Sequence, residues 1–137
     1  MTCLLDTGFL YALLNRTEQQ HAAVRLVADT IHEPIFLPVP VITEVAYLLK
    51  RDSGAEAVAK FAELLGNTDM ILEAPRSADY FRAAEIIRQY ADARIDFVDA
   101  IIVAIAERLN ITRVLTIDER DFRMFRPRHC AAFELLP

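Results

Sequence analysis

Short apolar runs alternate along this chain with longer stretches in which apolar side chains recur every three or four residues. The short runs are typical of buried strands, and the longer stretches are typical of amphipathic helices. The expected strands are Thr2–Leu5, Ile35–Leu37, Met70–Glu73, Arg113–Ile117 and Phe133–Leu136. Strands that alternate with helices predict an α/β fold with three layers, in which helices cover both faces of a central, mainly parallel sheet of about five strands.

Turn and cap residues separate the helical stretches. Pro38 and Pro40 precede one helix, Gly66 ends another, and Asn110 stands where a helix ends in a left-handed residue. The fifth helix should start at a Ser77 cap and turn Tyr80, Phe81, Ala84 and Ile87 inward and Arg82, Glu85 and Arg88 outward. The other expected helices are one after Asp6 that buries Phe9, Leu10, Leu13 and Leu14, then Gln20–Ile31, about Val41–Lys50, one from Ser53 or Gly54, then Phe97–Leu109 and a turn near Glu119–Phe122.

Length and composition favour one ordinary globular domain spanning residues 1–137. The chain is 54% hydrophobic, and its uncharged stretches are far shorter than the roughly 20 residues that a membrane helix needs. No basic segment followed by an apolar run marks a secretory leader. Cys3 and Cys130 have no metal-binding or redox spacing, so we expect reduced thiols. These features predict a cytoplasmic protein that does not enter a membrane.

The distribution of basic residues is more informative than the net charge of −5, which argues weakly against nucleic-acid binding. Lys50 and Lys60 are the two lysines among 15 basic residues, and the others are arginines, whose forked guanidinium suits phosphate. Five of these arginines fall between Arg113 and His129. This segment is explained equally well by phosphate contacts and by a solvated surface with ion pairs.

Six acidic residues follow strands and lie at or near the beginnings of helices. Because sites in parallel sheets form outside the carboxyl ends of the strands, most of these side chains should meet at one edge. Acids also cap helices and stabilise first turns, so each residue alone has a purely structural explanation. Together, however, they form an oxygen-only set that suits Mg²⁺ or Mn²⁺. The six are Asp6, Glu44, Asp96, Asp99, Asp118 and Asp121.

Four motifs in this order resemble those of the PIN domain, and in particular the VapC-type toxin ribonucleases. Each motif alone is weak, but the ordered set extends from Thr2 to about Phe122. The resemblance implies a PIN-like α/β/α fold. The motifs are Leu4-Leu5-Asp6-Thr7-Gly8-Phe9-Leu10, Thr43-Glu44-Val45, Asp96-Phe97-Val98-Asp99-Ala100-Ile101-Ile102-Val103-Ala104 and Leu115-Thr116-Ile117-Asp118-Glu119-Arg120-Asp121-Phe122.

The same resemblance assigns expected roles to individual residues. The acidic quartet of metal ligands and catalytic residues matches Asp6, Glu44, Asp99 and Asp118, with Glu44 completing the metal shell or helping to take a proton from water. Asp96 and Asp121 match auxiliary positions. Thr7 would orient the Asp6 carboxylate or a water, unless it only caps its helix, and Thr116 matches a residue near the cleft. Arg16, Arg120 and Arg123 are the candidates for holding the RNA backbone.

The function that the resemblance implies is metal-dependent endoribonuclease activity with Mg²⁺ or Mn²⁺, as the toxin of a toxin–antitoxin pair. The implied partners are the RNA substrate, a second copy in a homodimer, and an antitoxin that blocks the acidic cleft with a basic side chain. The first helix (Phe9, Leu10, Leu13) could receive the antitoxin, although core packing explains those residues equally well.

Two alternatives remain open at this point. One is a PIN-fold nuclease of RNA processing or DNA cleavage. The other is a noncatalytic α/β binding module. A receiver-like phosphoacceptor fits poorly, because Asp6 has no acidic neighbour and no lysine follows the last strands.

Overall fold

Five short strands form a fully parallel sheet at the centre of the computed structural model, which describes residues 2–137. The strand order is β3-β2-β1-β4-β5, and every pairing between neighbours is parallel. This arrangement confirms the expected fold class. The strands are β1 (Cys3–Leu5), β2 (Ile35–Pro38), β3 (Ile71–Glu73), β4 (Arg113–Leu115) and β5 (Glu134–Leu136).

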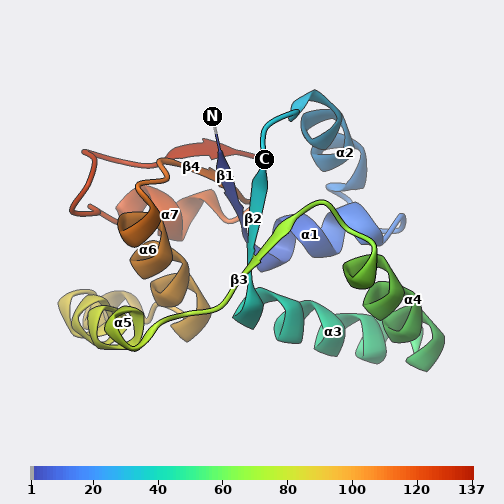
Figure 1. Cartoon of the computed structure of the whole chain (residues 1–137), viewed down its shortest axis with the longest axis horizontal. Helices are drawn as coiled ribbons and strands as arrows, with labels where there is room; N and C mark the ends of the chain where they lie inside the picture. The colour runs from blue at the N-terminus through green and yellow to red at the C-terminus, as the bar shows by residue number, and fades with distance from the viewer. Residues whose placement is uncertain (1) are drawn as a thin grey trace.

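Helices cover both faces of this sheet, as Figure 1 shows. One side carries α1 (Thr7–Leu14), α2 (His21–Thr30), α3 (Val39–Ser53) and α4 (Ala55–Gly66). The other side carries α5 (Ser77–Gln89), α6 (Phe97–Leu109) and α7 (Glu119–Met124). A single 3₁₀ turn at Ala91–Ala93, which the sequence pattern did not predict, connects α5 to α6.

The boundaries between helices follow from a few special residues. Gly54 has a φ of +87° and separates α3 from α4, which is a conformation that favours glycine. Asn110 adopts the expected left-handed conformation (φ +55°) at the end of α6. Helix α3 begins at Val39, two residues before the predicted start, because Pro40 is compatible with the first turn of a helix.

The core lies between the sheet and the helices on each face. Every residue of α6 from Val98 to Ala106 is buried, which agrees with the strongly apolar sequence of that helix. Phe9 and Leu10 of α1 are each about 1% exposed, so core packing explains them and they provide no free surface for a partner. Cys3 is buried and Cys130 is half-buried. No helix within residues 2–137 is long and apolar enough to cross a membrane.

Helix α5 faces its neighbours differently from the prediction. Tyr80 and Phe81 are 50% and 76% exposed, whereas the buried residues are Asp79, Ala83 and Ile86. The expected inward positions of Tyr80 and Phe81 are therefore wrong.

Ion pairs with α6 explain the rotation of α5. Arg108 Nη2 lies 2.9 Å from Asp79 Oδ2, and Arg82 Nε lies 2.7 Å from Glu107 Oε1, so Arg82 faces inward as well. Ser77 is the first helical residue and not the cap. Instead, the Asp79 carboxylate accepts a hydrogen bond from the backbone N–H of Arg76, the cap residue.

Candidate active site

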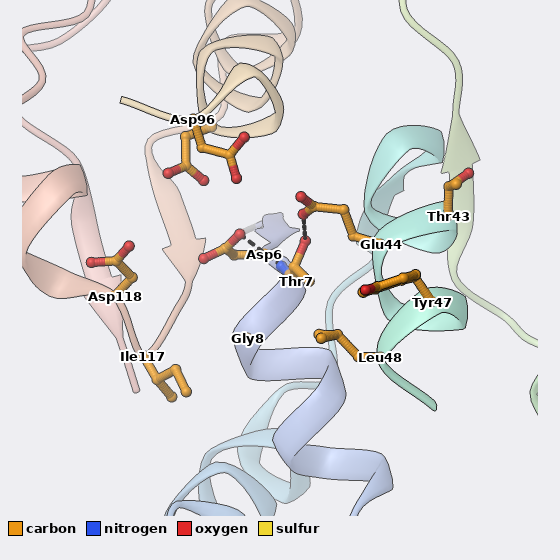
Figure 2. Close-up of a pocket in the computed structure, with 11 residues that line it drawn as sticks. Asp6, Thr7, Gly8, Thr43, Glu44, Tyr47, Leu48, Asp96, Ile117 and Asp118 are labelled. Atoms are coloured by element: carbon orange, nitrogen blue, oxygen red, sulfur yellow. Dashed lines mark hydrogen bonds between the residues drawn. The ribbon is translucent and has the colours of Figure 1, made fainter. Parts of the chain in front are cut away.

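The strand order reverses direction at the carboxyl ends of β1 and β4. The chain runs from β1 outward through β2 to β3, then crosses through α5 and α6 to place β4 on the other side of β1. Parallel sheets commonly bind ligands at such a switch point. A cavity of about 630 Å³ opens there, lined by Asp6, Thr7, Gly8, Thr43, Glu44, Tyr47, Leu48, Asp96, Asp99, Ile117 and Asp118 (Figure 2).

Asp6 occupies the middle of this edge, directly after β1. Its carboxylate accepts hydrogen bonds from the backbone N–H of Thr7 (2.7 Å) and from the hydroxyl of Thr116 (2.8 Å). The side chain is buried, and this burial raises the pKa of Asp6 to about 6, although both hydrogen bonds act in the opposite direction. Thr116 also accepts a hydrogen bond from the backbone N–H of Asp118 (2.9 Å), so one hydroxyl connects the ends of β1 and β4.

Glu44 reaches the cavity from α3 on the opposite side (Figure 2). The hydroxyl of Thr7 donates a hydrogen bond of 2.6 Å to Glu44 Oε1. Thr7 binds Asp6 through its backbone N–H and not through this hydroxyl, and the alternative that the hydroxyl orients a water stays a prediction. Because α3 starts early, Glu44 lies in its second turn and not in its first. Burial, followed by the nearby Asp96 carboxylate, raises the pKa of Glu44.

Asp99, Asp118 and Asp121 form the tightest acidic group of the described chain, with one carboxylate oxygen from each lying within 4.8 Å of the others. Asp99 is buried at the start of α6. Burial is the largest cause that raises the pKa of Asp99 to about 9, and the neighbouring carboxylates, beginning with Asp6, add to it. Crowded, partly desolvated carboxylates of this kind require protons or a cation. Oxygen-only ligands suit a hard divalent ion, and therefore the residues present fit Mg²⁺ or Mn²⁺.

Three of the acids cap helices and line the cavity at the same time. Asp6 is the N-cap of α1, Asp96 of α6 and Asp118 of α7, each accepting a hydrogen bond from a backbone N–H of the following turn. The structural and the chemical explanations of these residues are therefore compatible. Asp121 belongs to the acidic group with Asp99 and Asp118, and its backbone N–H donates to Asp118, but it does not line the cavity.

Further residues of α3 and of the segment after β4 line the cavity. Thr43, Tyr47 and Leu48 come from α3, and Ile117 comes from the segment after β4. The helical spacing of Tyr47 and Leu48 from Glu44, three and four residues, was the signal that places them on one face of α3.

The three candidate arginines do not line the cavity. Arg120 lines an adjoining groove of about 410 Å³ that shares Ile117 and Asp118 with it. Arg123 forms a 2.8 Å ion pair with Glu119, and Arg16 is exposed in the turn after α1. None of the residues that line the cavity is basic, so its own charge is entirely negative.

Comparisons with known proteins agree with this architecture. The family model of the PIN domain matches residues 3–126. Ribonuclease VapC26 of Mycobacterium tuberculosis (strain ATCC 25618 / H37Rv) is 31% identical over 135 residues, which are 98% of this chain and 99% of that protein.

Two solved structures resemble the fold at lower sequence identity. One is VapC20 of Mycobacterium tuberculosis, described as a sarcin-ricin loop cleaving toxin, with a TM-score of 0.77 at 22% identity over 82% of this chain and 86% of that one. The other is VapBC2 of Rickettsia felis bound to a DNA fragment from their promoter, with a TM-score of 0.72 at 16% identity over the whole of both chains. The family model covers most of the chain and the relative nearly all of it, and the chain therefore belongs to the PIN domain family.

Proposed function

We propose that this protein is a metal-dependent endoribonuclease that hydrolyses RNA phosphodiester bonds and acts as the toxin of a toxin–antitoxin pair. The observation that carries the proposal is the convergence of Asp6, Glu44, Asp99 and Asp118 on one cavity at the switch point of the sheet. The relative that is 31% identical is a ribonuclease, which supports RNA as the substrate.

The metal site is assigned to carboxylates on the sheet side of the cavity. Asp6, Asp99 and Asp118 would hold Mg²⁺ or Mn²⁺ directly or through water, with Asp96 and Asp121 in support. Bound metal would supply positive charge to the phosphodiester and lower the pKa of an attacking water. Without that charge, a cavity lined by acids would repel a phosphate.

The chain's own groups orient the reaction. Thr116 fixes the Asp6 carboxylate from the β4 side, and the backbone N–H of Thr7 fixes it from the α1 side. The hydroxyl of Thr7 holds Glu44 across the cavity, where its carboxylate would accept a proton from water. Its raised pKa makes it a better proton acceptor than an ordinary glutamate.

Arg120 is the strongest of the three arginine candidates for the RNA backbone. Its groove adjoins the cavity at Ile117 and Asp118, so an RNA strand that extends from the acidic cavity into this groove would pass Arg120. Contacts of this kind set affinity and register without reading sequence. Arg16 and Arg123 remain candidates for contacts farther along the strand.

Cleavage of RNA by the metal-free protein and its variants tests the proposal. We expect cleavage of single-stranded RNA with Mg²⁺ or Mn²⁺ and none in excess EDTA. Asp99→Asn should lower the rate at least a hundredfold while leaving the circular dichroism spectrum unchanged, because it removes a central metal ligand. Asp29→Asn, on the exposed face of α2, is the matched control and should cleave like the wild type. Full activity in EDTA, or in Asp99→Asn, contradicts the proposed site.

The partners and the biological role need separate measurements. Structural relatives include a toxin–antitoxin complex from Klebsiella pneumoniae, which supports an antitoxin partner here. A basic side chain from that antitoxin would neutralise the acidic cavity, and we also propose a homodimer and a cytoplasmic location. Induced expression should arrest growth, and Asp6→Asn should relieve the arrest. If both proteins arrest growth equally, cleavage at this site is not the cause.

A further inference from the structure

The cavity has two chemically different walls. One wall is formed by acids that follow β1 and β4 and begin α6, and the other is formed by α3 (Figure 2). Beyond Glu44, the α3 wall presents the ring of Tyr47 and the side chain of Leu48, and Ile117 lies on the other side, below Asp118 in Figure 2. A site that only held a metal and a phosphate would need no apolar wall of this kind.

Tyr47 is the tyrosine that lines the cavity, and its ring, like that of Tyr80, is not part of the core. It is 66% exposed, whereas Tyr11 is 6% exposed and its hydroxyl donates to Asp52. Tyr47 lies three residues after Glu44 and therefore on the same face of α3. The ring thus stands in solvent at the rim of the cavity, one helical turn from a proposed catalytic carboxylate.

We propose that Tyr47, with Leu48 beside it, is the stacking surface for an unpaired base of the RNA adjacent to the phosphodiester that is cut. This inference rests on the proposed function and specifies its substrate. Single-stranded nucleic acids commonly bind by stacking bases on exposed aromatic rings next to a site that holds the backbone. Bases in a duplex are already stacked on both sides, so this wall selects loops, bulges and single strands.

The charge of the cavity supports this assignment. No basic side chain lines it, and the nearest candidate for direct attraction to the substrate, Arg120, lies in the adjoining groove. Stacking is a source of affinity that requires no positive charge, and it leaves the carboxylates free for the metal. The base would lie against α3, while the phosphate would lie over Asp118 on the opposite wall (Figure 2) and over Asp99, which is close to Asp118.

Steady-state cleavage of a short fluorogenic single-stranded RNA with Mn²⁺ tests the proposal. Tyr47→Ala should raise KM on the order of tenfold and change kcat less than about twofold, since it removes a binding contact and no reacting group. Tyr47→Phe keeps the ring and should resemble the wild type. Leu26→Ala, which removes a side chain of similar exposure (71%) from α2, is the control and should also resemble it.

A scan of abasic substitutions through the same RNA identifies the base. At one position beside the cleavage site, removing the base should raise the KM of the wild type about as much as Tyr47→Ala raises it on the intact RNA. The same abasic RNA should raise the KM of Tyr47→Ala no further. If Tyr47→Ala is not folded by circular dichroism, Tyr47→Leu replaces it with the same expectations.

The outcomes distinguish a failure of the stacking proposal from a failure of the proposed nuclease function. The stacking proposal is overturned if Tyr47→Ala has an unchanged KM. It is also overturned if each abasic RNA raises KM equally in the wild type and in the variant. Neither result affects the proposed nuclease activity. A loss confined to kcat also overturns the stacking proposal. If the wild type cleaves no RNA with either metal, the proposed function itself fails, and the stacking role fails with it.

Discussion

The carboxylate of Asp6 stabilises the backbone and takes part in the proposed chemistry with the same two oxygens. One oxygen accepts the N–H of Thr7 and so caps α1, and the other accepts the hydroxyl of Thr116. Both contacts fix the orientation of the group before any metal binds. Preorganisation of this kind explains how a small cavity can hold several acids in defined positions.

The raised pKa values of the acids predict how the stability of the metal-free protein depends on pH. Asp99 in the folded protein has a pKa of about 9, whereas in the unfolded chain it loses its proton near pH 4. Between these values unfolding releases a proton, so stability falls as pH rises from about 4 to about 9 and levels off above that. The Asp6 carboxyl adds a smaller loss of stability between about pH 4 and about pH 6, because its pKa in the folded protein is about 6.

Thermal unfolding across pH 5 to 9 measures this effect. In EDTA the Tm of the wild type should fall as the pH rises. The Tm of Asp99→Asn should fall less, because its amide does not titrate. Mg²⁺ or Mn²⁺ should raise the Tm more at pH 8 than at pH 5, since the metal binds the ionised carboxylates. A Tm in EDTA that rises between pH 5 and 8, or the same slope in Asp99→Asn, would contradict the prediction.

The sequence predicted which acids line the cavity better than it predicted which groups form hydrogen bonds with their carboxylates. Asp6, Glu44, Asp99 and Asp118 were identified by their places after strands and by the resemblance, and all four line the cavity. Glu44 was not predicted as the partner of the Thr7 hydroxyl, because this contact joins two elements that are 37 residues apart in sequence. Sequence spacing carries no information on such a contact between elements.

At the scale of elements, the contact between α5 and α6 is stabilised by ion pairs as well as by apolar packing. Arg108 contacts Asp79 at 2.9 Å and Glu73 at 2.9 Å, and the Asp79 side chain is 3% exposed. These contacts explain why periodicity alone gave the wrong inward face for α5. Apolar spacing favoured Tyr80 and Phe81, but a buried acid needs its partner, and that requirement determined the rotation of the helix. The bounds of α6, whose sequence is almost continuously apolar, were predicted as Phe97–Leu109 and agree with the structure.

Removing the partner of Asp79 should therefore destabilise the fold. Arg108→Met leaves a buried carboxylate that only the N–H of Arg76 still contacts, and we expect a loss of about 3 kcal/mol in the free energy of unfolding. Chemical denaturation measures it. Arg123→Met, which breaks the exposed pair with Glu119, should cost less than about 1 kcal/mol. Equal losses in the two variants would contradict a structural role for the Asp79–Arg108 pair.

At the scale of the whole molecule, apolar side chains remain exposed on one edge of the sheet and on the neighbouring helix. Ile71 and Leu72 of the edge strand β3 are 40% and 44% exposed, and Phe81 of α5 is 76% exposed. Side chains of this kind in a folded protein are candidates for an interface, and the homodimer that the family resemblance implies would cover them. No feature of the sequence distinguished these residues from core positions, because both are apolar.

Phe81→Asp tests whether this surface forms the dimer. An aspartate in an apolar interface would be buried without a partner, so the variant should be a monomer by light scattering at concentrations where the wild type is a dimer. Leu26→Asp, at an equally exposed position on α2, should remain a dimer. A dimer that persists in Phe81→Asp would mean that the protomers associate through another face.

The crossover from β3 back to β4 also determines how much of the chain must be synthesised before the active site is complete. The hydroxyl of Thr116 that holds Asp6 lies 110 residues farther along the sequence, and Asp99 and Asp118 come from the same late half. Contacts so distant in sequence form slowly, after much of the rest has ordered. A growing or truncated chain that has not reached Asp118 has only part of the acidic cluster. The site is therefore complete only after the chain has been synthesised past Asp118.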